Sequence, residues 1–333
     1  MQTICISIKV ITITVIIKAM NNKKILGFVL GVLFVGILVY ILKVGIFSQH
    51  PQQSLNNSTA SQTSATVKVV AAENFYGDVA KQLGGDHVSV TSILSDPNID
   101  PHEYESDVQN AIAVSQADVV IENGLDYDTW MDKLLSASPN NNRTVIIGGQ
   151  IAPHPLPDNP HVWYGVDNMP AIASAISDAL KKSDPADAAT FDANLQTFDN
   201  SLNPIQQKIA EIKNKFVGTP VGLTETIYLY QTQAAGLNVL TPLEFEKAIA
   251  EGNDPSAADV KTANDQINSR QAKVLIYNSQ TVTPITTNLQ NEAKQLNIPI
   301  VPVSETMLGN KNYQSWMLDQ LNNLEQDLTL VVK

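Results

Sequence analysis

The chain has 333 residues, 44% of them hydrophobic, which is enough for two domains of ordinary size once non-globular ends are set aside. Its net charge is −12, and no acidic residue precedes residue 67, so 16 basic residues oppose 33 acidic ones in the remainder. Such a body repels nucleic-acid phosphates and attracts cations, and we expect no nucleic-acid partner. The single cysteine, Cys5, lies in the N-terminal segment, which excludes thiolate metal sites and cysteine nucleophiles from the body.

The N-terminal segment contains a candidate membrane anchor. Residues 25–42 are apolar and uncharged, and at about 1.5 Å per residue they cross most of a bilayer's hydrocarbon. Lys23 and Lys24 precede this run, which by the positive-inside rule leaves the N-terminus in the cytoplasm and the body outside the cell. No small-residue cleavage motif follows Phe47, so we expect an uncleaved signal-anchor in the cell membrane. Met20, followed by Asn-Asn-Lys-Lys, is typical of a natural start.

The next segment, rich in Gln, Ser, Thr and Asn, is predicted to be a flexible tether. After it, short β-branched runs alternate with stretches of helical spacing, which predicts a mostly parallel sheet flanked by helices. The expected strands are residues 67–71, 88–94, 119–121 and 145–147, and the expected helices are 75–83, 107–115 and 127–135. A second, shorter series follows Gly218, with strands near residues 221–223, 274–276 and 298–301.

A long amphipathic stretch separates the two series. Its apolar residues, from Phe191 to Phe216, are spaced by alternating fours and threes, the period of one helical face. A helix over this stretch would be about 45 Å long at about 1.5 Å per residue. Pro204 favours two helices, whereas the unbroken phase favours one bent helix. We therefore expect an α/β protein with an anchor segment (1–47), a tether (48–66), an N-terminal lobe (67–186), one long connecting helix (187–217) and a C-terminal lobe (218–333).

Five histidines are candidates for a metal site, because a body without cysteine must bind a transition metal through imidazole nitrogens and carboxylate or amide oxygens. His102 and His161 each follow a proline, which fixes φ and lowers the entropy lost when the ring is immobilised. His50 lies in the tether. The turn of Gly-Gly-Asp before His87 favours a solvated position, and the prolines on both sides of His154 favour a surface loop.

An ordered set of short motifs runs from about residue 67 to the C-terminus. In chain order the motifs are Glu73-Asn74-Phe75-Tyr76, Asp100-Pro101-His102, Ala117-Asp118-Val119-Val120, Asn123-Gly124-Leu125, Asn159-Pro160-His161-Val162-Trp163, Thr224-Glu225 and Val303-Ser304-Glu305-Thr306. The set resembles the substrate-binding proteins of bacterial zinc and manganese ABC importers. This resemblance implies a non-enzymatic, monomeric receptor that binds one divalent metal ion between two lobes and delivers it to a membrane permease with a cytoplasmic ATPase. The chain has no Walker-type phosphate loop, so the ATPase must be another polypeptide.

Carried over to this sequence, the resemblance implies four metal ligands: His102 and His161 from the first lobe, and Glu225 and Glu305 from the second. Family members that bind zinc often have histidine at the third position, and the fourth is usually aspartate. Two imidazoles and two carboxylates suit Mn²⁺ but still accept Zn²⁺, so we lean towards Mn²⁺. For Glu225 the alternative is an acid at a helix N-terminus, and for Glu305 a solvated loop.

Ligating imidazoles usually donate their second N–H to an oxygen. The candidate partners are Asp100, Glu103, Tyr228, Asn278 and Gln280. Two other classes of protein are alternatives: a zinc-dependent hydrolase and a surface adhesin. The hydrolase is disfavoured because the sequence has no His-Glu-x-x-His motif and because four ligands leave no position for a water molecule. The tether fits an adhesin equally well.

Overall fold

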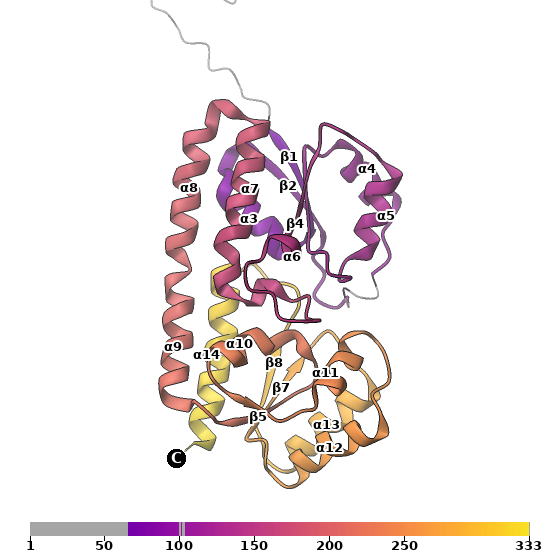
Figure 1. Ribbon diagram of the computed structural model, residues 1–333, viewed down its shortest axis with the longest axis vertical. Helices are drawn as coiled ribbons and strands as arrows, with labels where there is room; N and C mark the ends of the chain where they lie inside the picture. The colour runs from indigo at the N-terminus through magenta and orange to yellow at the C-terminus, as the bar shows by residue number, and fades with distance from the viewer. Residues whose placement is uncertain (1–65, 100, 102–103, 333) are drawn as a thin grey trace, which may run out of the picture. The chain divides into compact units, whose positions relative to one another are not determined.

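The computed structural model describes residues 66–99, 101 and 104–332, all of which belong to one compact unit. They form two four-stranded sheets with the strand orders β2-β1-β3-β4 and β6-β5-β7-β8. Every strand pair is parallel. The strands are β1 (Val67–Glu73), β2 (Val88–Leu94), β3 (Val119–Glu122), β4 (Thr144–Ile147), β5 (Pro220–Leu223), β6 (Asn238–Val239), β7 (Val274–Asn278) and β8 (Ile300–Val303). The expected pair of parallel-sheet lobes is confirmed (Figure 1).

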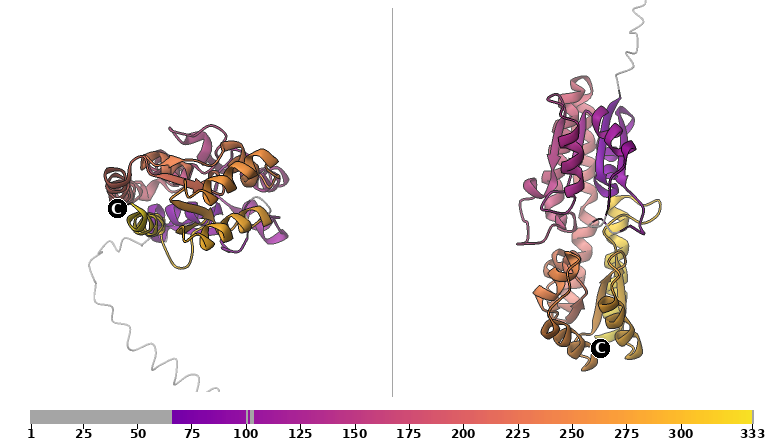
Figure 2. Two further views of the ribbon diagram at one scale, coloured as in Figure 1. Left: turned by 90° about the horizontal axis from the view of Figure 1, so that it is seen from below. Right: turned by 90° about the vertical axis from the view of Figure 1, so that its right-hand side faces the viewer.

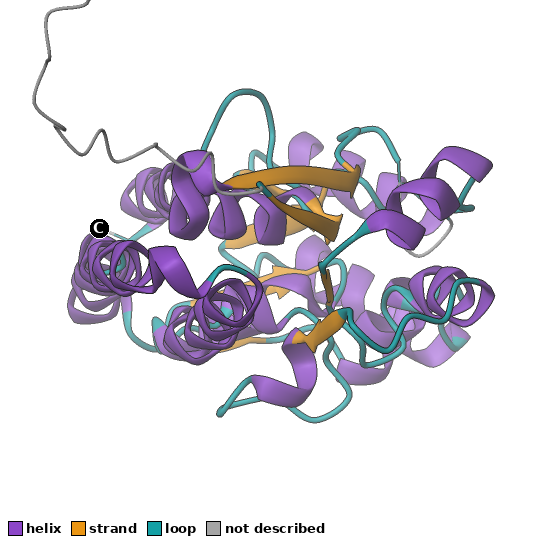
Figure 3. Cartoon of the chain, turned by 90° about the horizontal axis from the view of Figure 1, so that it is seen from above, coloured by secondary structure: helices purple, strands orange, loops and turns teal. Residues whose placement is uncertain are grey.

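Strand β1 organises the N-terminal lobe, because it pairs with β2 on one side and β3 on the other. Its side chains alternate between two cores: Val69 and Ala71 enter one, whereas Val70 and Ala72 enter the other. Helices cover both faces, which explains why β1 is apolar almost throughout (Figure 3). The helices of this lobe are α3 (Asn74–Gly84), η1 (Gly85–His87), α4 (Val108–Gln116), α5 (Thr129–Ala137), α6 (Gly148–Ile151), η3 (Val162–Tyr164), η4 (Val166–Asn168) and α7 (Met169–Ser183).

The C-terminal lobe repeats the same strand order, with β5 and β6 shorter than their counterparts β1 and β2. Strand β6 was not expected from the sequence, because two residues are too few to show a period. One separate core lies under α12 and α13, where Leu275 packs with Ile267 and Leu289. The helices of this lobe are η6 (Thr226–Tyr228), α10 (Leu229–Ala234), α11 (Leu243–Ala250), α12 (Ala257–Asn268), α13 (Pro284–Gln295) and α14 (Tyr313–Val331).

The connection between the lobes consists of two helices rather than the single bent helix expected from the periodicity. After the short turn η5 (Pro185–Asp187), α8 (Ala188–Ser201) and α9 (Asn203–Phe216) follow one another in a single column beside both lobes (Figure 1). The break falls at Leu202, whose N–H bonds to the carbonyl three residues back. Pro204 lies in the first turn of α9, where a missing N–H removes no helical hydrogen bond. The apolar phase continues through the break, since Leu202 and Ile205 are both buried.

A continuous aromatic core joins the two lobes. The rings of Phe75 and Trp163 stack with centroids 4.4 Å apart, and Trp316 of α14 lies 6.1 Å from Phe75. The hydroxyl of Tyr164 donates to the carbonyl oxygen of Ser304 at 2.7 Å, and α14 also packs against α9 and α3 (Figure 2). These contacts cross between the halves, so the junction is part of the hydrophobic core rather than a hinge of loops.

The expected membrane anchor at residues 25–42 lies outside the described residues. Within residues 66–99, 101 and 104–332, no helix combines the length and the apolar character needed to span a bilayer.

Candidate metal centre

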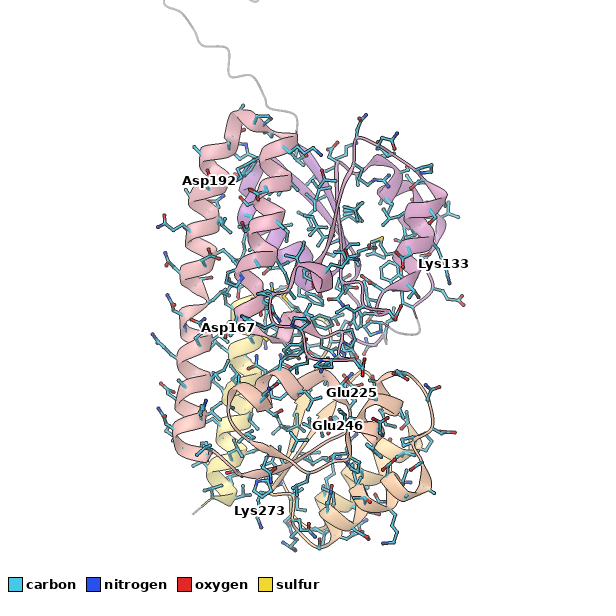
Figure 4. The ribbon with its side chains drawn as sticks, in the orientation of Figure 1. Lys133, Asp167, Asp192, Glu225, Glu246 and Lys273 are labelled. Carbon is cyan, nitrogen blue, oxygen red and sulfur yellow. The ribbon has the colours of Figure 1, made fainter. Side chains whose placement is uncertain are left out.

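Three of the four candidate ligands converge at the junction of the lobes. Ligand atoms of His161, Glu225 and Glu305 all lie within 4.8 Å of one another. The three residues are almost completely buried, with 0%, 1% and 0% of their surface exposed. Glu225 lies at the end of the C-terminal lobe that faces the N-terminal lobe (Figure 4). His102, the fourth candidate, lies outside the described residues.

Parallel topology explains this convergence. Glu225 and Glu305 each follow a strand of the C-terminal sheet by two residues, after β5 and β8 respectively. The carboxyl ends of parallel strands meet at one edge of a sheet, which is where α/β proteins usually bind ligands. His161 approaches from the other lobe, at the residue before η3.

Asn159 orients the His161 ring. Its Oδ1 accepts a hydrogen bond from the backbone N–H of His161 at 3.0 Å and lies 2.8 Å from the ring Nδ1. Because a carbonyl oxygen can only accept, Nδ1 is the protonated nitrogen. In the neutral ring Nε2 therefore carries the lone pair, and it lies 3.7 Å from Oε2 of Glu305. The Asn159 amide also donates to the carbonyl of Thr226 in the other lobe at 2.8 Å, which fixes this arrangement across the junction.

One amide holds the two candidate carboxylates. Nδ2 of Asn278 donates to Oε1 of Glu225 at 2.6 Å and to Oε1 of Glu305 at 2.7 Å. Asn278 is the last residue of β7, which lies between β5 and β8 in the sheet. The order of the strands therefore places this donor between the two acids, and its partial positive charge reduces their mutual repulsion.

Gln280 links the Glu305 loop to the segment that precedes His102. Its Oε1 accepts from the backbone N–H groups of Glu305 at 2.7 Å and Thr306 at 2.9 Å. Its Nε2 donates to the carbonyl of Ile99 at 2.8 Å. A single buried side chain thus contacts both loops.

Tyr127 is a contact that the sequence analysis missed. Its hydroxyl donates to Oε2 of Glu305 at 2.6 Å. Burial, followed by the charge of Glu305, raises the pKa of Tyr127 well above its usual 10, so it remains a protonated donor. Gly124, Leu125 and Asp126 all have positive φ values of 71°, 57° and 62°, and this left-handed turn carries Tyr127 to the site. Nothing in residue type or spacing predicts two consecutive non-glycine residues in that conformation.

The remaining candidates have other roles or lie outside the described part. Tyr228 packs its ring edge-on against Tyr164, with centroids 5.5 Å apart, and its hydroxyl makes no hydrogen bond to any described residue. Asp100, Glu103 and His50 lie outside the described residues. The side chain of His154 is exposed, as expected for a surface loop.

The N-terminal lobe contributes three further buried acids near the same edge. Burial, followed by repulsion from Asp128 and Glu122, raises the pKa of Glu73 well above its usual value. Burial also raises the pKa of Glu122 to about 8 and that of Asp128 to about 6. The two backbone N–H groups that donate to Asp128, from Asn123 and Gly124, oppose part of this rise. Glu73 and Glu122 therefore tend towards the protonated form at neutral pH, unlike a carboxylate that binds a cation.

A cleft of about 750 Å³ lies beside the candidate centre, lined by residues of both lobes that include Asn159 and Thr226. Its rim is acidic, and its one lysine, Lys247, is paired with Asp158 across the lobes at 2.9 Å. The field in this cleft favours a cation. An imidazole nitrogen and two carboxylates, buried beside it, have the donor chemistry of a divalent transition-metal site.

Comparisons with known proteins agree with this chemistry. The family described as ZnuA, zinc-uptake complex component A, periplasmic, matches residues 69–327. The metal ABC transporter substrate-binding lipoprotein SsaB of Streptococcus sanguinis is 29% identical over 180 residues, 50% of this chain and 56% of that protein. The corresponding lipoprotein ScbA of Streptococcus cristatus is 23% identical over 314 residues, 88% of this chain and 97% of that protein.

A solved structure shares the fold. The periplasmic zinc-binding protein TroA from Treponema pallidum superposes with a TM-score of 0.67 at 18% identity, over 79% of this chain and 99% of that one. The family match covers most of the chain, including both lobes. The chain therefore belongs to the family of the periplasmic zinc-uptake complex component A.

Proposed function

We propose that this protein is the solute-binding component of an ABC importer, which captures one divalent transition-metal ion between its lobes and delivers it to a membrane permease. A separate cytoplasmic ATPase drives that permease, since the chain has no phosphate-binding loop. The observation that carries the proposal is the convergence of His161, Glu225 and Glu305, from both lobes, within 4.8 Å of one another. A buried set of one imidazole and two carboxylates is otherwise costly to assemble.

His102 is the proposed fourth ligand. Support comes from Gln280, which bonds both to Ile99, three residues before His102, and to the backbone of Glu305. A short loop from Ile99 has the reach to bring His102 into the same site. Four protein ligands would saturate a tetrahedral ion and leave no position for a reactive water, which favours a carrier over a hydrolase.

Mn²⁺ or Zn²⁺ is the proposed cargo. Two imidazoles with two carboxylates form a harder donor set than three imidazoles, and carboxylates can chelate through both oxygens. Mn²⁺ accepts such a set readily, whereas Zn²⁺ binds most donor sets more tightly. The acids Asp126, Asp158, Glu244 and Glu251 around the cleft would concentrate either cation at the mouth of the site.

The proposed location is the outer face of the cell membrane, held by a helix at residues 25–42 with a cytoplasmic N-terminus. SsaB and ScbA are named lipoproteins. In this chain the only cysteine, Cys5, precedes the apolar run, so a cysteine after that run is not available for a lipid anchor. A helical anchor and a tether would perform the same task.

The test is metal binding by the full-length chain, purified in detergent without a histidine tag. We expect one tightly bound ion of Mn²⁺ or Zn²⁺ per chain to co-purify, as counted by mass spectrometry, and we expect its loss in Glu225→Gln. Glu244→Gln, which removes an exposed acid from the cleft rim, is the matched control and should retain the ion. Binding of no transition metal by the wild type, or unchanged binding by Glu225→Gln, would contradict the proposal. Binding to a host protein by a metal-free chain would instead support an adhesin.

A further inference from the structure

We propose a second divalent-cation site, formed by His87, Asp184 and Asp187, at the end of the N-terminal lobe away from the cleft. His87 ends η1, Asp184 directly follows α7, and Asp187 ends η5 just before α8. One ligand atom from each of the three residues lies within 4.8 Å of the others. The corner where α7 passes into α8 lies far from the C-terminal lobe (Figure 1), so this cluster is separate from the candidate centre at the junction.

The state of Asp184 points to a ligand. Only 8% of its surface is exposed, and its Oδ2 is buried without a hydrogen-bond donor among the described residues. No lysine, arginine or histidine of the described part comes within 4.0 Å of its carboxylate. Its backbone N–H bonds to the carbonyl of Leu180 and ends α7, so the local fold fixes this residue in place. A buried carboxylate oxygen without a donor is unfavourable unless a cation or a proton joins it.

His87 and Asp187 supply the other two ligands. Nδ1 of His87 lies 2.8 Å from Oδ2 of Asp187, and the ring packs edge-on against Phe191. Two ligand atoms about 2.1 Å from one ion and at a right angle are about 3 Å apart, so this spacing also suits neighbouring ligands. An ion pair between His87 and Asp187 would explain their contact, but it leaves the oxygen of Asp184 unexplained.

The donor set defines the ligand class. One imidazole and two carboxylates suit a divalent ion such as Zn²⁺ or Mn²⁺, with water completing the coordination. The side chains of His87 and Asp187 are 31% and 24% exposed, so the ion has access from solvent. A bound ion would tie η1, at the end of α3, to the start of the connecting column of α8 and α9. The site would therefore strengthen the attachment of α8 to the N-terminal lobe, whether or not an ion is bound at the junction of the lobes.

Equilibrium dialysis of the full-length, tag-free chain in detergent against Zn²⁺, with metal counted by mass spectrometry, tests this site. We expect two ions per chain, one bound tightly at the junction and one more weakly. Asp184→Asn and His87→Asn should each weaken only the second ion, by at least about tenfold, as expected when one ligand is removed. Asp192→Asn is the control: this exposed acid of α8 lies at the same end of the lobe (Figure 4), pairs with Lys181 and should leave both ions bound.

Circular dichroism verifies that each variant is folded. If Asp184→Asn does not fold, the binding of the second ion by His87→Asn tests the proposal. A wild-type chain that binds one ion at millimolar free Zn²⁺, and keeps that ion in both variants, would overturn the proposal. Equal binding of the second ion by the wild type and both variants would overturn it as well. A single wild-type ion that is lost in both variants would support this site and count against the junction site.

Discussion

The two lobes share one strand order, but the acidic side chains at the carboxyl ends of their strands have different surroundings. In the N-terminal lobe, burial, followed by repulsion from Asp128, raises the pKa values of Glu73 and Glu122. In the C-terminal lobe, Glu225 and Glu305 share the amide donor of Asn278, and Glu305 also accepts from Tyr127. Burial beside other acids therefore favours the neutral form of Glu73 and Glu122, whereas donors aimed at the oxygens of a carboxylate favour the ionised form that a cation requires.

The sharpest test of this contrast exchanges one acid in each lobe. Glu305→Gln should lower the affinity for Mn²⁺ and Zn²⁺ by more than about a hundredfold, beyond the range typical of outer partners of a metal site. Glu73→Gln, which replaces a neutral acid by a neutral amide, should bind almost as the wild type does. Isothermal titration calorimetry measures both. Similar losses in the two variants would remove the distinction between the lobes.

The donor between the two acids is the next target. Asn278→Ala should reduce metal affinity by about ten- to hundredfold, because both carboxylates lose the amide that orients them. Asn278→Asp should be worse still, since it adds a third negative charge to a buried site. Competition with a fluorescent chelator gives the affinities. An Asn278→Asp chain that binds better than Asn278→Ala would show that the extra carboxylate acts as a ligand.

The pH dependence of stability tests the N-terminal edge. The pKa of Glu122 is raised to about 8 from about 4.5, so the folded state binds more protons than the unfolded state between these values. The free energy of unfolding attributable to Glu122 therefore falls as pH rises from about 4.5 to about 8 and is level above that. Glu122→Gln should be more stable than the wild type at pH 9 by several kcal/mol, at most about 5 kcal/mol for a shift of this size, and equal to it near pH 4.5.

Urea unfolding of the metal-free chain at both pH values measures this difference. Glu251→Gln, a change at an exposed acid, is the control and should follow the wild type at each pH. If Glu122→Gln loses stability as steeply as the wild type when the pH rises, a group other than Glu122 is responsible for the pH dependence.

The smallest expected effect is at the hydrogen bond from Tyr127 of the N-terminal lobe to Glu305. Tyr127→Phe keeps the buried ring and removes only the donor, so metal affinity should fall by about tenfold. Phe in place of Tyr164, whose hydroxyl bonds to Ser304 and Gln320, is a matched change at another lobe contact and should leave the affinity unchanged. If Tyr127→Phe loses as much metal affinity as Asn278→Ala does, the hydrogen-bond donors of the two lobes would contribute equally to holding Glu305.

Much of the fold could be predicted from local patterns, and the failures have physical causes. Strands such as β1 and β2 are runs of β-branched residues long enough to show their period, and their positions were predicted closely. The break at Leu202 was missed because both helices keep the same apolar phase, so that Pro204 was the only signal. Strand β6 is recognisable only through its pairing with β5.

The candidate site, like the fold, could be predicted only in part from the sequence. His161 and the two glutamates carry signals in the sequence, since each belongs to a short motif at a strand end or after a proline. Their role as ligands stays a prediction, as does that of His102. Tyr127 and the contact of Gln280 with Ile99 depend on tertiary structure alone: the first on a left-handed turn, the second on the approach of the two lobes.

The aromatic core of Phe75, Trp163 and Trp316, which joins the two lobes, has a consequence for how the protein could evolve. Either half synthesised alone would present large rings to water and should precipitate, whereas co-expressed halves should recover a soluble pair. Recombination between the genes of relatives would succeed only where the aromatic rings that the two halves contribute to this core pack together. The two halves should therefore be exchangeable only as a unit, even though each has its own complete sheet.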